Sequence, residues 1–135
     1  MEYVFGQFTE EHLKKMEEGI HLFNEQKYWE CHESLEEIWL EDRTDNARYI
    51  YWAVIQVAAA CIHYRDGKIL GAQGMIAKAK EKFKKARELH VLTPVVNKLN
   101  WYELEEMVLK VPEGPQSKLS DFSDLFDFRF PTAHS

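Results

Sequence analysis

The sequence predicts an all-α protein, a compact bundle of about five helices whose third helix is apolar and central. Three observations support this fold class. Apolar residues recur at helical spacing in five segments, short polar turns separate these segments, and the 135 residues match the length of one domain. With 45% apolar and 30% charged residues, the composition is that of a folded globular protein. We therefore expect residues 1–115 to form a single helical domain.

The first three helices are predicted from apolar spacing and from the residues at their ends. The first is expected at 9–24, where a threonine and two glutamates suit a helix N-terminus. The second is expected at 28–40 and the third at 46–64, with a short polar connection between them. The third is apolar nearly all round and contains three consecutive alanines. A helix without a polar face is usually central in its bundle.

The fourth and fifth helices are bounded by glycine and proline. The fourth is expected at 69–89, after a turn at Gly67, and it combines one apolar stripe with six basic residues on its remaining surface. We interpret that basic stripe as a solvated helix face. Thr93 and Pro94 interrupt the pattern, and the fifth helix is expected at 101–110.

The last segment, 116–135, is rich in serine and aspartate but contains several large apolar side chains. They are Phe122, Leu125, Phe126, Phe128 and Phe130. Folded proteins rarely leave so much apolar surface in water. We expect this aromatic tail to dock on the bundle or on a neighbouring chain.

Charge and hydropathy restrict the classes of function. The net charge of −6 argues against general nucleic-acid binding, which needs clustered lysine and arginine. The longest apolar stretch, 53–62, is far shorter than a membrane span, and residues 1–6 do not resemble a secretory signal. Cys31 and Cys61 lack metal-site spacing and fall in apolar segments, so we expect reduced core thiols in a cytoplasmic protein.

The second and third helices carry polar residues beside their apolar stripes. At about 100° per residue, His32 and Glu36 stack one turn apart at the border of the core, and Glu33 lies further round. Gln56 and His63 share one face of the third helix. An antiparallel pair would bring these groups together. The candidate polar cluster is His32, Glu33, Glu36, Gln56 and His63, and its expected walls are Trp29, Trp39 and Trp52.

Three interpretations of this cluster remain open. The groups could form a structural network of hydrogen bonds that fixes helix packing. His32, Glu36 and His63 could instead hold a divalent metal ion, since imidazole and carboxylate bind zinc, manganese or iron. A histidine held by a glutamate could also act as a general base. The zinc-protease motif is His-Glu-x-x-His, whereas this chain has Glu36 at the last position, which argues against a protease.

Two runs of the sequence resemble the signature of the family called domain of unknown function 309. The first, 28–39, reads Tyr-Trp-Glu-Cys-His-Glu-Ser-Leu-Glu-Glu-Ile-Trp, and the second, 54–63, reads Val-Ile-Gln-Val-Ala-Ala-Ala-Cys-Ile-His, followed by Gly71 and Ala72. The resemblance covers about 23–83. It implies a small fold of packed helices, and it implies that the signature positions are His32, Glu33, Glu36, Trp39, Gln56, His63, Gly71 and Ala72. It implies no reaction or ligand.

Two functional hypotheses follow from the sequence. The first is a binding or scaffold module in which the polar cluster is structural, with a protein partner or a second copy of the chain as its target. The second is a metal-binding or small-ligand protein, or a hydrolase-like enzyme, that uses His32, Glu36 and His63. The other histidines are isolated in the sequence, and we expect them at the surface or at its boundary: His12, His21, His90 and His134.

Overall fold

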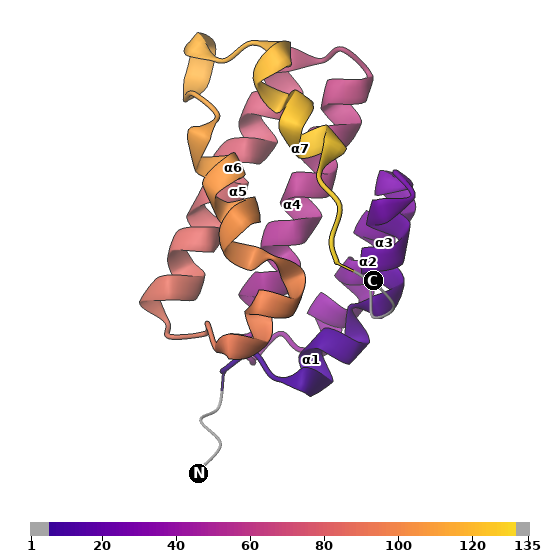
Figure 1. The fold of residues 1–135 in the computed structure, drawn as a ribbon, viewed down its shortest axis with the longest axis vertical. Coiled ribbons are helices and arrows are strands. Elements are labelled where there is room, and N and C mark those ends of the chain that lie inside the picture. The colour runs from indigo at the N-terminus through magenta and orange to yellow at the C-terminus, as the bar shows by residue number, and fades with distance from the viewer. Residues whose placement is uncertain (1–5, 132–135) are drawn as a thin grey trace.

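A computed structural model describes residues 6–131, and their fold is all-α, which confirms the predicted fold class (Figure 1). The described part contains seven α-helices and three short 3-10 helices. In chain order they are α1 (Glu10–Lys15), α2 (Glu17–Asn24), α3 (Tyr28–Glu41), α4 (Arg48–Arg65), α5 (Ile69–Glu88), η1 (Pro94–Leu99), α6 (Trp101–Lys110), η2 (Gly114–Gln116), η3 (Leu119–Phe122) and α7 (Ser123–Asp127).

The helix expected at 9–24 is in fact two helices, α1 and α2, that meet at Met16. Thr9 caps α1: its hydroxyl accepts from the His12 amide, and the His12 ring accepts from the Thr9 amide in return. The Met16 amide donates to the carbonyls of both His12 and Leu13, a shared bond typical of a helix end. Because the apolar spacing continues through Met16, which is fully buried, the sequence pattern does not reveal the break.

Helices α3, α4 and α5 form the centre of the fold, and each pair is joined by a short connection. Helix α4 packs along both α3 and α5, as expected for the most apolar helix. Helix α2 covers the other side of α3 at close range, since a Cβ built on Gly19 would lie 2.5 Å from the Leu35 side chain. The four helices α2–α5 therefore enclose most of the N-terminal core.

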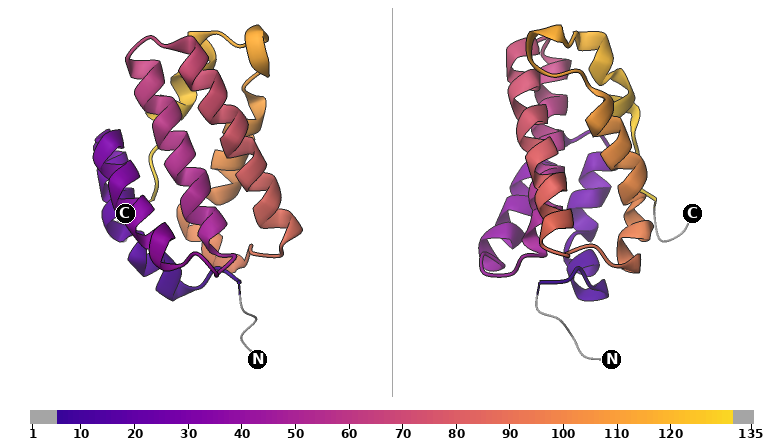
Figure 2. Two further views of the ribbon diagram at one scale, coloured as in Figure 1. Left: turned by 180° about the vertical axis from the view of Figure 1, so that it is seen from behind. Right: turned by 90° about the vertical axis from the view of Figure 1, so that its left-hand side faces the viewer.

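The C-terminal half covers only one side of α4 and α5. In Figure 1, α6 and α7 lie in front of these two helices, and in the view from behind (Figure 2, left) α4 and α5 lie in front. Trp101 is fully buried at the start of α6 and packs against Phe83 of α5, with the rings tilted and their centroids 4.5 Å apart. Within residues 6–131, no helix covers the opposite side of α4.

The aromatic tail packs on the bundle as far as it is described. Four of its side chains are buried: Phe122, Leu125, Phe128 and Phe130. The Asn24 amide group both donates to the Phe130 carbonyl (2.9 Å) and accepts from the Phe130 amide (2.8 Å). The Tyr28 hydroxyl donates to the Phe126 carbonyl at 2.9 Å. These bonds tie the tail to α2 and α3, while residues 132–135 of the expected tail lie outside the described part.

Two further properties of the described residues concern the hydropathy of the helices and the state of the two cysteines. Over residues 6–131, no helix is both long and apolar enough to cross a membrane. Cys31 and Cys61 are free and buried. Burial raises the pKa of each thiol to about 12.

Candidate binding face

The signature residues of α3 and α4 are brought together by an antiparallel packing of the two helices. The indole rings of Trp39 and Trp52 meet edge to face, with centroids 5.0 Å apart. About two turns away, Cys31 and Cys61 lie close enough for the charge of one thiolate to raise the pKa of the other thiol. These two contacts define one antiparallel register along both helices.

Helix α5 packs on the other flank of α4, also antiparallel. The His63 ring lies directly on Gly71, because a Cβ built there would be 2.4 Å from His63 Nδ1. Three turns along α4, the Lys82 ammonium sits 4.5 Å from the ring centroid of Trp52. Partial burial there lowers the pKa of Lys82. Gly71 is therefore required by the approach of the imidazole, which gives a physical reason for a glycine at this signature position.

The two registers place one set of side chains on the uncovered side of α4. His32 lies at the level of Ala59, between Gln56 and His63, and Lys78 lies at the level of Gln56. We call this surface the α4 face. Its residues are Trp29, His32, Glu36 and Trp39 of α3, Trp52, Gln56, Ala59 and His63 of α4, and Gly71, Met75, Lys78 and Lys82 of α5.

In the middle of α4, the α4 face is the side that reaches solvent. Trp52, Gln56, Ala59 and His63 are partly exposed, whereas the other residues of α4 from Ile50 to Cys61 are buried. Trp29, on the α3 rim of the face, is 57% exposed and lies parallel to the His32 ring, with centroids 5.5 Å apart. A large exposed indole supported by a second ring is typical of an interaction surface.

Four polar atoms on this face are buried and have no hydrogen-bond partner within residues 6–131. They are His32 Nδ1, Trp39 Nε1, Gln56 Oε1 and His63 Nδ1. Only one further side-chain atom of the described part shares this property, the indole nitrogen of Trp101. A buried polar group without a partner costs about 1–3 kcal/mol. The cost is concentrated on one surface of the fold.

The glutamates of the predicted cluster lie apart from these atoms. Glu36 is exposed on the rim, and no hydrogen bond or ion pair within the described chain joins it to His32. Glu33 is also exposed, and it borders a surface depression shared with Glu18 and Ser34 on the α2 side. Helix geometry explains this: one residue beyond His32 is about 100° further round, which takes Glu33 away from α4.

The predicted metal set of His32, Glu36 and His63 is not gathered. In the part of the chain that the structure describes, no group of three or more His, Cys, Asp or Glu side chains could hold a metal ion. Glu36 points to solvent at the rim, and the His63 ring packs on Gly71. The arrangement offers separate hydrogen-bonding atoms rather than a convergent set of ligands.

Two features escaped the sequence analysis. His12 was expected at the surface or its boundary but is buried, and its Nε2 donates to the Asp45 carboxylate at 2.9 Å, which ties α1 to the loop before α4. The lysines of α5 were interpreted as a solvated face, yet Lys78 and Lys82 border the α4 face. The spacing of these lysines places them on one side of α5, but only the packing shows what lies beside them. His134 lies outside the described residues.

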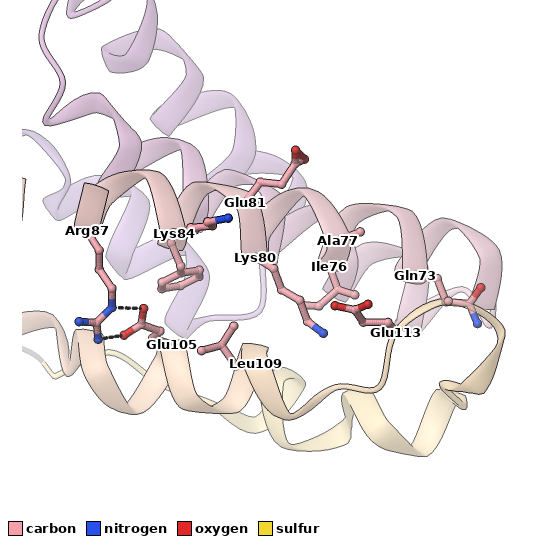
Figure 3. A pocket seen from close by; sticks show the side chains of 12 residues that line it. Gln73, Ile76, Ala77, Lys80, Glu81, Lys84, Arg87, Glu105, Leu109 and Glu113 are labelled. Carbon is pink, nitrogen blue, oxygen red and sulfur yellow. Dashed lines mark hydrogen bonds and ion pairs between the residues drawn. The ribbon is translucent and has the colours of Figure 1, made fainter. Parts of the chain in front are cut away.

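A groove of about 610 Å³ lies on the opposite side of α5, between that helix and α6 (Figure 3). Its apolar wall includes Ile76 and Leu109. At one end the Glu105 carboxylate, itself buried, accepts from Arg87 through two N–H groups, one of them Nε at 2.8 Å. The Lys80 ammonium donates to the Val111 carbonyl at 2.6 Å. These charges are used to join α5 to the C-terminal half.

Comparison with known proteins gives a family but no activity. Residues 16–75 match the model of the domain of unknown function (DUF309). The chain is 40% identical over 50 residues to the uncharacterized protein YpuF of Bacillus subtilis (strain 168); this stretch is 37% of the chain and 29% of YpuF. No solved structure matches the chain significantly.

The matched segment contains α2, α3, α4 and the start of α5, which are the elements that build the α4 face up to Met75. The sequence signature, the helical fold and the family model agree over this part of the chain. Residues 16–75 of this protein therefore constitute a domain of the DUF309 family.

Proposed function

We propose that this protein is a protein-interaction module that binds its partner through the α4 face. The observation that carries the proposal is the concentration of four partnerless buried polar atoms on a partly exposed surface. The Trp39 indole nitrogen can only donate a hydrogen bond, and Gln56 Oε1 can only accept one. A metal ion cannot serve an N–H donor, whereas a polypeptide offers both carbonyl oxygens and amide groups. These atoms are closed to solvent in the unbound chain, so a docked protein chain matches this set once the side chains that carry them turn outward on binding.

The aromatic content of the face supports the same proposal. Tryptophan is enriched at the centres of protein interfaces, where it buries a large area at a small cost in side-chain entropy. Trp29, Trp39 and Trp52 lie along the face, and Trp29 leaves more than half of its surface in solvent. The proposal gives the His–Gln cluster a role in binding instead of the structural network that the sequence suggested, since no hydrogen bond in residues 6–131 joins its members.

The first test measures the stability of the unbound protein. Gln56→Leu removes a buried carbonyl that has no partner, so it should raise the free energy of unfolding by about 1 kcal/mol. Gln73→Leu is the matched control on α5, since the Gln73 amide donates to the Ser117 carbonyl at 3.3 Å, and it should lower that free energy. Urea denaturation followed by circular dichroism measures both. If Gln56→Leu is as destabilising as Gln73→Leu, the cluster is structural and the proposal fails.

The second test asks whether the face is occupied in cells. A photo-crosslinking residue is placed at Ala59, in the middle of the face, and in a separate variant at Ala77, which is exposed beside the α5–α6 groove. We expect a discrete crosslinked product from position 59 and none from position 77. The product should disappear when Gln56→Leu is added. Absence of any product from position 59, or equal products from both positions, would contradict the proposal.

A further inference from the structure

We propose that a second copy of this chain covers the α4 face, forming a dimer whose twofold axis runs along α4. The inference rests on the proposed function and names the partner. Both arguments for it come from the arrangement of side chains on the face. One is the opposite charge of its two rims, and the other is the ring that its protruding indole meets across the axis.

The two rims of the face carry opposite charges at the same level. Glu36 is exposed on the α3 rim, and Lys78 is exposed on the α5 rim, both level with Gln56. A twofold axis along α4 lays α3 of one copy over α5 of the other without changing the level. Glu36 of each copy then meets Lys78 of the other, and the contact occurs twice. An axis across α4 would instead lay α3 on α3 and bring like charges together, so the charges select the first arrangement.

The shape of the face fits the same axis. Trp29 protrudes on the α3 rim, and the matching level of the α5 rim is Gly71, whose missing side chain is replaced by the His63 ring that packs on it. The twofold operation therefore places each exposed indole against the partly exposed His63 ring of the other copy. Along the axis, Ala59 is small enough to let the two α4 helices approach. Near the axis the two Gln56 side chains face each other. Once they turn outward, the Gln56 Oε1 atom of each copy can accept from the Gln56 Nε2 group of the other, which supplies the missing partner.

The size of the face predicts a weak dimer. Helix α4 has 18 residues and is about 27 Å long, and three adjacent helices span about 20 Å. The face therefore covers on the order of 500 Å² per copy and about 1,000 Å² in total, near the lower end of specific interfaces. A dissociation constant on the order of micromolar is expected for such an area.

Sedimentation equilibrium of the full chain tests the arrangement by charge reversal. Glu36→Lys and Lys78→Glu should each weaken the dimer by about tenfold or more, because each turns both rim contacts from attraction to repulsion. An equimolar mixture of the two variants should regain the dimer, because both rim contacts of the mixed dimer again join a lysine to a glutamate. Lys110→Glu is the control, since Lys110 is an exposed lysine of α6, away from the α4 face, where it pairs with Glu106. This change should leave the dimer intact. Circular dichroism confirms that each variant is folded.

Each outcome decides the proposal. Loss of the dimer in both single variants and its recovery in the mixture support it. A wild-type chain that stays monomeric at concentrations up to about 100 μM, about 100 times the expected dissociation constant, overturns it. A dimer that either single variant leaves unchanged also overturns it, and so does a mixture that does not restore the dimer. If the wild-type chain is monomeric while position 59 still crosslinks to a different protein, the inference fails and the proposed function stands. If position 59 gives no product and Gln56→Leu is destabilising, both fail.

Discussion

Replacing Gly71 by alanine tests the packing of α5 on α4 most directly. An added Cβ would lie 2.4 Å from Nδ1, 2.6 Å from Cγ and 2.7 Å from Cε1 of the His63 ring. Non-bonded carbon atoms prefer a separation of about 3.5–4.0 Å, so the ring would have to move by about 1 Å or the helices would have to separate. The ring lies between α4 and α5, and the contact includes Cγ, the atom that attaches the ring to the rest of the side chain. Moving only the far end of the ring therefore cannot relieve the clash.

The net effect is a balance of two terms. Alanine is about 1 kcal/mol more favourable than glycine in a helix interior. Overpacking of a filled site costs about 1–3 kcal/mol. We expect Gly71→Ala to lower the free energy of unfolding by about 1 kcal/mol. Gly74 is the matched control, because nothing lies within 4 Å of a Cβ built there, and Gly74→Ala should raise that free energy by about 1 kcal/mol.

Urea denaturation of four proteins completes the test: the wild-type chain, Gly71→Ala, His63→Ala and the double variant. Without the imidazole the clash is gone, so Gly71→Ala should become stabilising in the His63→Ala background. The double-mutant cycle should give a coupling energy of about 1–3 kcal/mol. If Gly71→Ala stabilises the wild-type chain as much as Gly74→Ala does, the close approach of His63 to α5 is refuted.

Three further predictions concern the packing of the fold. Asn24→Ala removes both hydrogen bonds that tie the C-terminal segment to α2; it should cost about 1–2 kcal/mol and make that segment the first site of limited proteolysis. Arg87→Leu leaves the buried Glu105 carboxylate unpaired and should cost about 2–3 kcal/mol, most of which Glu105→Gln in the same chain should restore. The pKa of the Cys31 and Cys61 thiols is raised from 9.0 to about 12, so folding favours their protonated forms. Their contribution to stability is complete below pH 9 and is lost as the pH rises toward about 12. Denaturation at several pH values should show this fall in the free energy of unfolding, and replacing both cysteines by alanine should make the fall smaller.

Much of the fold could be predicted from local pattern. The helix expected at 101–110 coincides with α6, and the one expected at 28–40 differs from α3 by a single residue. Such segments combine a strong apolar period with clear end signals, and both are local properties. The break at Met16 could not be predicted in this way, because the period runs through it and the break depends on a shared backbone hydrogen bond. The turns from η2 to α7 are too short to show any period.

The candidate site shows the same division. A helical wheel places His32 and Glu36 on one side of their helix, and the sequence alone determines that relation because it follows from the geometry of a single helix. The wheel cannot show which element packs against that side. Only the tertiary structure decided that Glu36 points to solvent and that the His63 ring rests on Gly71. The physical reason is that the period along one helix fixes directions, whereas contacts depend on the level at which two helices pack.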